Sequence, residues 1–238
     1  LEILPGVSLR YVRNVQELKN PDMIILPGTK NTMEDLLWMR QNGLEAAILK
    51  KAAEGKIIFG VCGGYQMLGE QLSDPDHVEA GGRIQGMGLL PMETVFQQSK
   101  TRTRVNGCFS QLEGALEMLS GVSLEGYEIH MGETKFVGDA GVLTRIEDTI
   151  QGKAKADGAW KGNVYGTYVH GIFDREDVAK KVAEAIGKKK GLDMSQIKGM
   201  DFAAFKETQY DLLAEGLRKH LDMKKIYEIL ETGIETSK

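Results

Sequence analysis

Cys62 is the residue whose surroundings best fit catalysis. It follows residues 56–61, an apolar segment that reads as a buried strand, and a segment with helical spacing begins directly after it. A nucleophile at such a tight turn is exposed at the carboxyl end of the strand, and glycines must flank it because side chains there would clash. Gly60, Gly63 and Gly64 meet that requirement. We expect the free N–H groups of the helix start to lower the pKa of the thiol and to hold an oxyanion. The plainer interpretation, a core cysteine in a strand, is disfavoured by the glycines.

A cysteine nucleophile needs a general base, and the chain has four histidines. His170 ends an alternating segment, residues 164–169, and precedes a glycine, so we expect it at a strand end, where catalytic groups sit in α/β folds. His77, in an acidic loop, and His220, on a basic helical stretch, are predicted to be solvated. His130 lies in another alternating strand, which is compatible with a group that supports the site and more so with a hydrogen-bonded structural histidine.

Composition excludes several classes of protein. The 238 residues carry a net charge of -4 from intermixed acids and bases, so there is no basic surplus for nucleic acid. No apolar run approaches the roughly 20 residues that span a bilayer, and the first residues do not resemble a signal peptide, so we expect a cytoplasmic protein without a membrane partner. The two cysteines lie in unrelated contexts and form no metal-ligand motif, so no metal site is expected.

The elements that must position Cys62 and His170 follow a βαβ pattern at the start of the chain. Residues 23–26 form an apolar run that ends at Pro27-Gly28, and two helical segments lead from there to the strand at 56–61. Residues 86–169 are mostly short strand-like pieces, and the chain becomes helical again beyond residue 174. The fold class predicted is α/β, with a central, mostly parallel sheet flanked by helices, and with C-terminal helices.

The segment from Gly60 to Gly69 resembles the G-x-C-x-G-x-Q nucleophile motif of class I, or triad, glutamine amidotransferases. Together with segments 26–32, 127–132 and 166–174, it makes nearly the whole chain similar to the carboxy-terminal glutaminase domains of cobyric acid synthases. The resemblance implies a flavodoxin-like fold. In the related cobyrinic acid a,c-diamide synthases the first loop and the residues around the nucleophile differ, so this branch stays the alternative.

The resemblance also implies roles for individual residues. Cys62 attacks the carboxamide of glutamine, and His170 protonates the departing ammonia and then activates water. Backbone N–H groups of Gly63 and of the loop with Gly28 and Thr29 stabilise the oxyanion. Gln66 helps to hold the substrate.

One position departs from the family pattern. Most triad amidotransferases have a glutamate two residues after the histidine, and Ile172 stands there in this chain. His170 therefore acts in a dyad or borrows a carboxylate from elsewhere, with Glu128 and Glu133 as the candidates. The cobyric acid synthase branch shares this loss.

The expected organisation is one glutaminase domain over residues 1–238, with residues 202–231 as a helical extension. In the family, a separate amino-terminal synthetase domain binds ATP and Mg²⁺, and this chain has no G-x-x-x-x-G-K-[ST] loop and no initiator methionine, so we expect that domain to be absent and no cofactor to be bound here. The expected partners are glutamine and the synthetase domain, which activates carboxylates of a cobyrinic acid diamide. The alternatives are a cysteine hydrolase on the same fold and a redox-sensing module; Gln66 favours glutamine, and His170 disfavours the redox sensor.

Overall fold

The computed structural model describes residues 1–238 except residues 3, 5, 193–201 and 234–238. The chain divides into two compact units, Leu1–Gly199 and Met200–Lys238. The first unit contains all of the strands found in the described ranges and every predicted site residue.

A four-stranded sheet lies at the centre of the first unit. Its order is β1-β2-β10-β9, and the strands are β1 (Met23–Leu26), β2 (Ile57–Val61), β10 (Val164–Thr167) and β9 (Ala159–Lys161). β2 pairs in parallel with both β1 and β10, whereas β9 is antiparallel to β10. The predicted central, mostly parallel sheet is therefore confirmed.

Alternate side chains of β2 enter two different cores. Ile58 packs with the helices α2 (Thr32–Gln41) and α3 (Leu44–Ala53). Ile57 and Phe59 pack on the opposite face, in the cluster that contains residues of α5 (Glu176–Lys189). Burial on both faces explains why β2 reads as a continuous apolar run. The short α1 (Val15–Leu18) precedes β1, and α5 (Glu176–Lys189) buries Val178 and Val182, as the helical spacing predicts.

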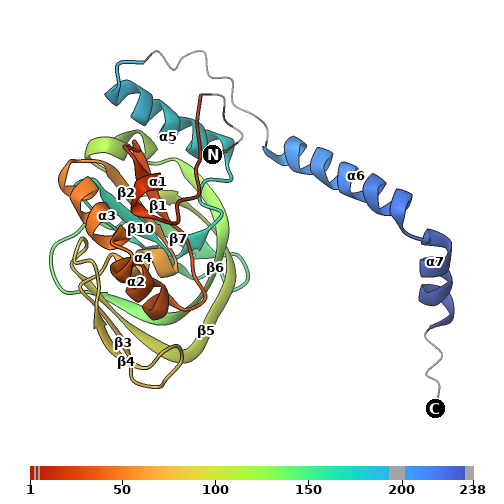
Figure 1. Ribbon diagram of the computed structural model, residues 1–238, viewed down its shortest axis with the longest axis horizontal. Helices are drawn as coiled ribbons and strands as arrows, with labels where there is room; N and C mark the ends of the chain where they lie inside the picture. Colours follow the sequence, from red (N-terminus) through yellow and green to blue (C-terminus); the bar gives the residue numbers. More distant parts are fainter. Residues whose placement is uncertain (3, 5, 193–201, 234–238) are drawn as a thin grey trace. The chain divides into compact units, whose positions relative to one another are not determined.

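A second, seven-stranded sheet makes up most of the rest of the unit. The bounds of its strands are β3 (Gln71–Asp74), β4 (Gly82–Gln85), β5 (Met92–Phe109), β6 (Ser123–Phe136), β7 (Thr144–Asp148), β8 (Ala154–Asp157) and β11 (Val169–His170). All of its pairings are antiparallel except that of β3 with β5. β5 and β6 are long, curved neighbours (Figure 1). The sequence predicts strands in this half, but not that they form a sheet of their own.

The strand that leads to His170 changes sheets. We predict one strand over residues 164–169; in the structure β10 ends at Thr167 in the parallel sheet, and β11 pairs with β6 in the other sheet. The buried carboxylate of Asp157 holds this crossing, because it accepts hydrogen bonds from Thr167 Oγ1 and from Tyr168 N, the latter at 3.2 Å. Thr167 Oγ1 in turn accepts from Val169 N at 2.9 Å.

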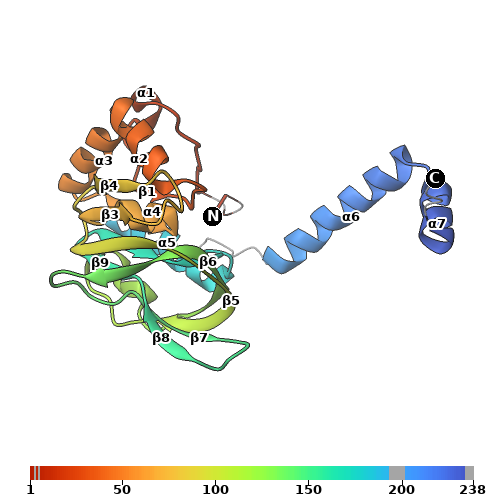
Figure 2. The same ribbon diagram turned by 90° about the horizontal axis from the view of Figure 1, so that it is seen from below.

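Two short helices complete the first unit. They are α4 (Gly63–Met67) and a 3-10 helix (Gly114–Leu119). Seen from below, α1, α2 and α3 lie at one end of the first unit, and β7 and β8 lie at the opposite end (Figure 2).

The described part of the second unit consists of two helices, α6 (Phe202–His220) and α7 (Met223–Thr232). The break falls where Asp222 caps α7 by accepting a hydrogen bond from Lys225 N at 3.1 Å. Within the part of the chain that the structure describes, no helix combines the length and the apolar character needed to cross a bilayer.

Candidate active site

Cys62 occupies the predicted elbow between β2 and α4. Its backbone has φ 52° and ψ -112°, a strained conformation for a residue with a side chain, and its N–H donates to Thr167 O at 2.8 Å. A Cβ on Gly60 would stand 2.6 Å from Tyr65 Cα, and a Cβ on Gly64 would overlap the backbone of Leu26. These glycines are therefore required by the close approach of backbone to backbone.

His170 and Cys62 converge on Gly28. A Cβ on Gly28 would stand 2.7 Å from His170 Cε1, 3.6 Å from His170 Nδ1 and 3.4 Å from Cys62 Cβ. The imidazole is partly buried and stacks on the ring of Tyr127, with ring centroids 5.0 Å apart and an interplanar angle of 7°. The expected strand-end position of His170 is confirmed, and the absence of a side chain at Gly28 leaves room for the imidazole.

The loop after β1 packs against the start of α4. A Cβ on Gly63 would stand 2.7 Å from Thr29 Oγ1 and 3.1 Å from Thr29 N. As the first residue of α4, Gly63 has an N–H without an intrahelical acceptor, and this N–H acts on the thiol of Cys62. Gly28, Thr29 and Gly63 thus lie beside Cys62, and their roles as oxyanion donors stay a prediction.

The side chain of Gln66 is occupied by contacts inside the protein. Its Oε1 accepts from Thr32 Oγ1 at 3.2 Å, and its Nε2 donates to Tyr168 OH at 3.1 Å and to Met131 O at 3.5 Å. Gln66 is buried, so these bonds tie α4 to its neighbours. Its expected contact with the substrate stays a prediction.

The electrostatics of Cys62 correct one expectation. Burial raises the pKa of its thiol to about 11, although the N–H of Gly63 lowers it; the charge of Glu79 raises it further. Desolvation outweighs the helix start because Cys62 is only 7 % exposed and α4 has only five residues. The thiol also donates to Ile129 O at 3.6 Å, so the resting cysteine is protonated.

His170 is suited to accept that proton. Burial, and then the charge of His130, lower the pKa of the imidazole below its ordinary value. At neutral pH the ring is therefore uncharged and has a nitrogen free to act as a base.

The carboxylates considered as partners of His170 differ in their surroundings. Glu133 is exposed and lies 3.5 Å from Lys135 Nζ. Glu128 is 1 % exposed and accepts from Lys155 Nζ at 2.8 Å. Ile172 is buried in the apolar core, and His170 Nε2 is buried with no hydrogen-bond partner among the described residues.

Glu79 lies beside the site but is not among the residues predicted from the sequence, where only His77 of the same acidic loop was considered and expected to be solvated. The Glu79 carboxylate is partly buried and caps α2, with Oε1 accepting from Thr32 Oγ1 at 3.1 Å and Oε2 from Met33 N at 3.1 Å. Its loop is held by buried Asp74, which accepts from the N–H groups of Val78, Glu79 and Gly81 at 2.8 Å each. The cap joins residues 46 and 47 positions apart, so no local signal in the sequence indicates it.

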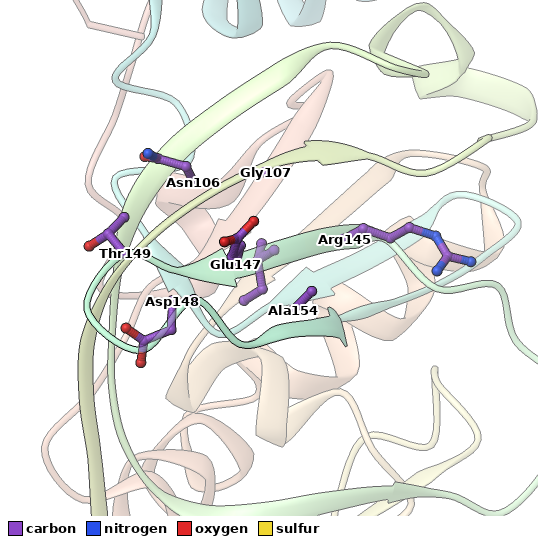
Figure 3. A pocket seen from close by; sticks show the side chains of 9 residues that line it. Asn106, Gly107, Arg145, Glu147, Asp148, Thr149 and Ala154 are labelled. Carbon is purple, nitrogen blue, oxygen red and sulfur yellow. The ribbon is translucent and has the colours of Figure 1, made fainter.

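A surface hollow lies elsewhere, beside the turn between β7 and β8 (Figure 3). Its lining includes Asn106, Arg145, Glu147, Asp148 and Thr149, and contains none of the predicted site residues. Across the described ranges, no group of three or more histidine, cysteine or acidic side chains is arranged to hold a metal ion.

Comparison with known proteins decides the family. Residues 1–178 match the family described as the CobB/CobQ-like glutamine amidotransferase domain. The chain belongs to this family. Solved structures agree on the fold: a glutamine amidotransferase with a TM-score of 0.54 at 20% identity covers 76% of this chain and 88% of its own, and PurLQS from Thermotoga maritima, with 0.55 at 21%, covers 76% and 85%.

Curated relatives of this amidotransferase domain are cobyric acid synthases. That of Ruminiclostridium cellulolyticum is 52% identical over 99% of this chain, and that of Lachnoclostridium phytofermentans is 47% identical over 98%. That of Photorhabdus laumondii is 43% identical over 98%. The chain spans only 46% or 47% of the length of these relatives.

Proposed function

We propose that this domain hydrolyses glutamine to glutamate and ammonia, with Cys62 as the nucleophile and His170 as the general base. The observation that carries the proposal is the convergence of the two side chains on Gly28. A protonated thiol beside a neutral imidazole is a pair that can transfer one proton as the sulfur attacks.

Glutamine hydrolysis proceeds in two steps, formation of a glutamyl thioester and hydrolysis of that thioester. Cys62 Sγ bonds to the carboxamide carbon while His170 takes the thiol proton, and N–H groups of Gly63 and the Gly28–Thr29 loop stabilise the oxyanion. The C–N bond then breaks, and His170 returns its proton to the leaving ammonia, which leaves a glutamyl thioester. Water attacks the thioester as His170 accepts a proton from it, and the proton returns to the sulfur as glutamate leaves.

Glu79 supplies a recognition group for the amino-acid end of glutamine. Its partly buried carboxylate has its pKa raised by burial and pairs with no lysine, arginine or histidine among the described residues. Burying an uncompensated charge is unfavourable, and the α-ammonium group of glutamine would compensate it beside Cys62. In this arrangement Gln66, whose side-chain amide is hydrogen-bonded inside the protein, holds the elbow in place and contacts the bound glutamine.

The domain would serve as one half of a larger ligase. Its relatives are cobyric acid synthases more than twice its length, which supports a role as the ammonia source for an ATP- and Mg²⁺-dependent synthetase half. The acceptors would be side-chain carboxylates of a cobyrinic acid a,c-diamide, in cobalamin biosynthesis in the cytoplasm. The family description also covers CobB-like domains, so cobyrinic acid a,c-diamide synthesis is the second candidate.

The test of the proposed function is release of glutamate from glutamine by the chain and by Cys62→Ala. Cys108→Ala is the matched control, because Cys108 is a free, partly exposed thiol in β5. We expect hydrolysis to vanish in Cys62→Ala and to persist in Cys108→Ala. Hydrolysis that survives Cys62→Ala would end the catalytic assignment.

A further inference from the structure

We propose that Tyr168 is a positioning residue, whose buried hydroxyl fixes the helix of the nucleophile against the strands that lead to the base. The inference rests on the proposed glutaminase function, which it deepens by naming a group that holds Cys62 and His170 in register. Tyr168 lies two residues before His170, at the crossing from β10 to β11, and its partner Gln66 lies four residues after Cys62, on α4. Their contact therefore joins the two elements that carry the reacting side chains.

The elbow is joined to this crossing at two levels. Cys62 N donates to Thr167 O at 2.8 Å, and one turn further along the helix Gln66 Nε2 donates to Tyr168 OH at 3.1 Å. One hydrogen bond leaves an element free to turn about it, whereas a second bond a helical turn away also fixes the angle. The bond from the Cys62 thiol to Ile129 O cannot do this during catalysis, because the thiol gives up its proton as it attacks.

The amide of Gln66 has one orientation that satisfies its neighbours. Nε2 lies 3.5 Å from Met131 O, an atom that can only accept, so the nitrogen and not the oxygen must face this carbonyl and Tyr168. Oε1 then faces Thr32 Oγ1, which donates to it at 3.2 Å. A turned amide would place two oxygens against each other in a buried position. The Tyr168 hydroxyl is therefore the nearer acceptor of an amide that has no alternative arrangement.

The Tyr168 side chain is itself held firmly. Because its oxygen accepts from the amide, its own proton goes to Thr134 Oγ1 at 2.5 Å, and Thr134 Oγ1 lies 2.7 Å from Thr94 Oγ1. The hydroxyl is thus anchored to β6 and through it to β5. The ring packs edge-on against Tyr65 with centroids 5.2 Å apart, and stacks on His130 with centroids 3.8 Å apart. Removal of the hydroxyl alone would leave this ring packing in place.

A second buried tyrosine of the same segment separates positioning from plain stability. Tyr165, on β10, is fully buried, and its hydroxyl accepts from Leu116 N at 3.3 Å and donates to Glu113 O at 3.4 Å. These partners belong to the 3-10 helix and to its N-terminal cap, and not to the elbow. Tyr165 and Tyr168 therefore offer the same chemical change, the loss of a buried hydroxyl with two hydrogen bonds, at one position that holds α4 through its hydroxyl and at one that does not.

The first experiment compares Tyr168→Phe with the matched control Tyr165→Phe. We expect Tyr168→Phe to lower kcat for glutamine hydrolysis about 10-fold with KM within about threefold, because the sulfur and the imidazole lose their mutual alignment while the substrate contacts stay. Tyr165→Phe should keep kcat within about twofold of the wild type. In chemical denaturation both variants should lose a similar amount of stability, since each loses a buried hydroxyl. Equal kcat values in the two variants would overturn the proposal.

A double-mutant cycle with Gln66→Met tests whether Tyr168 acts through the amide. Methionine keeps the length of the side chain without its hydrogen bonds, so adding Tyr168→Phe to Gln66→Met should lower kcat no further. Losses of kcat that multiply would overturn the proposal. Denaturation of the same four proteins needs no turnover and should show the same non-additivity; additive losses of stability would reject the hydrogen bond itself. Absence of any Cys62-dependent hydrolysis in the wild type would instead reject the proposed function.

Discussion

The Cys62 side and the His170 side of the candidate site are built from different kinds of contact. On the Cys62 side, β2, the start of α4 and the segment from Leu26 to Thr29 approach each other closely, largely backbone to backbone, and the glycines leave that space open. On the His170 side, the imidazole belongs to a two-residue strand that is held by polar contacts: the hydrogen bonds of Asp157 at the crossing and the pairing with β6.

The difference assigns separate tasks to the two sides. Local packing at the elbow fixes where the sulfur stands, and it tolerates almost no added volume. Long-range polar contacts fix the position of the His170 imidazole and its charge. Substitutions on this side can change side-chain volume with little effect, but they cannot remove a charge or a hydrogen bond without effect. Variants on the first side should therefore affect folding most, and variants on the second side should affect turnover most.

Gly64→Ala is the most severe test of the elbow. A Cβ at this position would overlap the carbonyl of Leu26, and neither backbone can move without breaking the β1–β2 layer. We expect a loss of about 4 kcal/mol in the free energy of unfolding, measured by chemical denaturation. Gly216→Ala, in α6, meets no atom within 4 Å and should leave unfolding of the first unit unchanged. A Gly64→Ala protein of normal stability would show that the elbow is looser than its contacts indicate.

His170→Asn tests the other side without disturbing the fold. The amide keeps polar bulk but cannot accept and return the proton, so turnover of glutamine should fall by at least ~10². His220→Asn, an exposed histidine of the second unit, is the control and should stay within about twofold of the wild type. If His170→Asn turns over normally, His130 becomes the candidate base, and the comparison between the two sides must be redrawn.

Alkylation of Cys62 tests the charge state that burial imposes on the elbow. A thiol with a pKa of about 11 carries roughly 10²-fold less thiolate at pH 7 than an ordinary cysteine, so iodoacetamide should react correspondingly slowly. In a Cys108→Ser background the rate should still be rising above pH 9. A plateau below pH 8 would mean that the helix start, and not desolvation, governs the thiol.

Glu79→Gln tests recognition of the substrate, with a smaller effect. The amide keeps the caps on Thr32 and Met33 partly in place but loses the charge that would hold the α-ammonium group. We expect KM for glutamine to rise about 10-fold with a smaller change in kcat. Asp76→Asn, an exposed acid in the same loop, is the control and should leave KM unchanged. Equal KM values for the two variants would remove Glu79 from the substrate site.

These expectations also show what the sequence could and could not reveal. The elbow was predictable because its strand, cysteine, glycines and helix are contiguous, and each has a local physical reason. The position of His170 at a strand end was predictable for the same reason. The change of sheet at Tyr168, the capping by Glu79 and the burial of Glu128 were not, because each depends on partners from distant strands or loops. The expected lowering of the Cys62 pKa is wrong, because burial raises this pKa and burial is a property of the whole fold.

Tyr127→Ala should have the smallest effect and separates stacking from charge on the His170 side. The ring of Tyr127 lies parallel to the imidazole and is 48% exposed, so it restricts the orientation of His170 without desolvating it fully. A stacked aromatic pair contributes about 1 kcal/mol, which predicts a loss of roughly fivefold in kcat for Tyr127→Ala. Tyr127→Phe keeps the ring and should retain wild-type turnover. A loss in Tyr127→Phe as large as in Tyr127→Ala would point to the hydroxyl, and the orientation of His170 would then depend on a polar contact of β6 and not on its aromatic face.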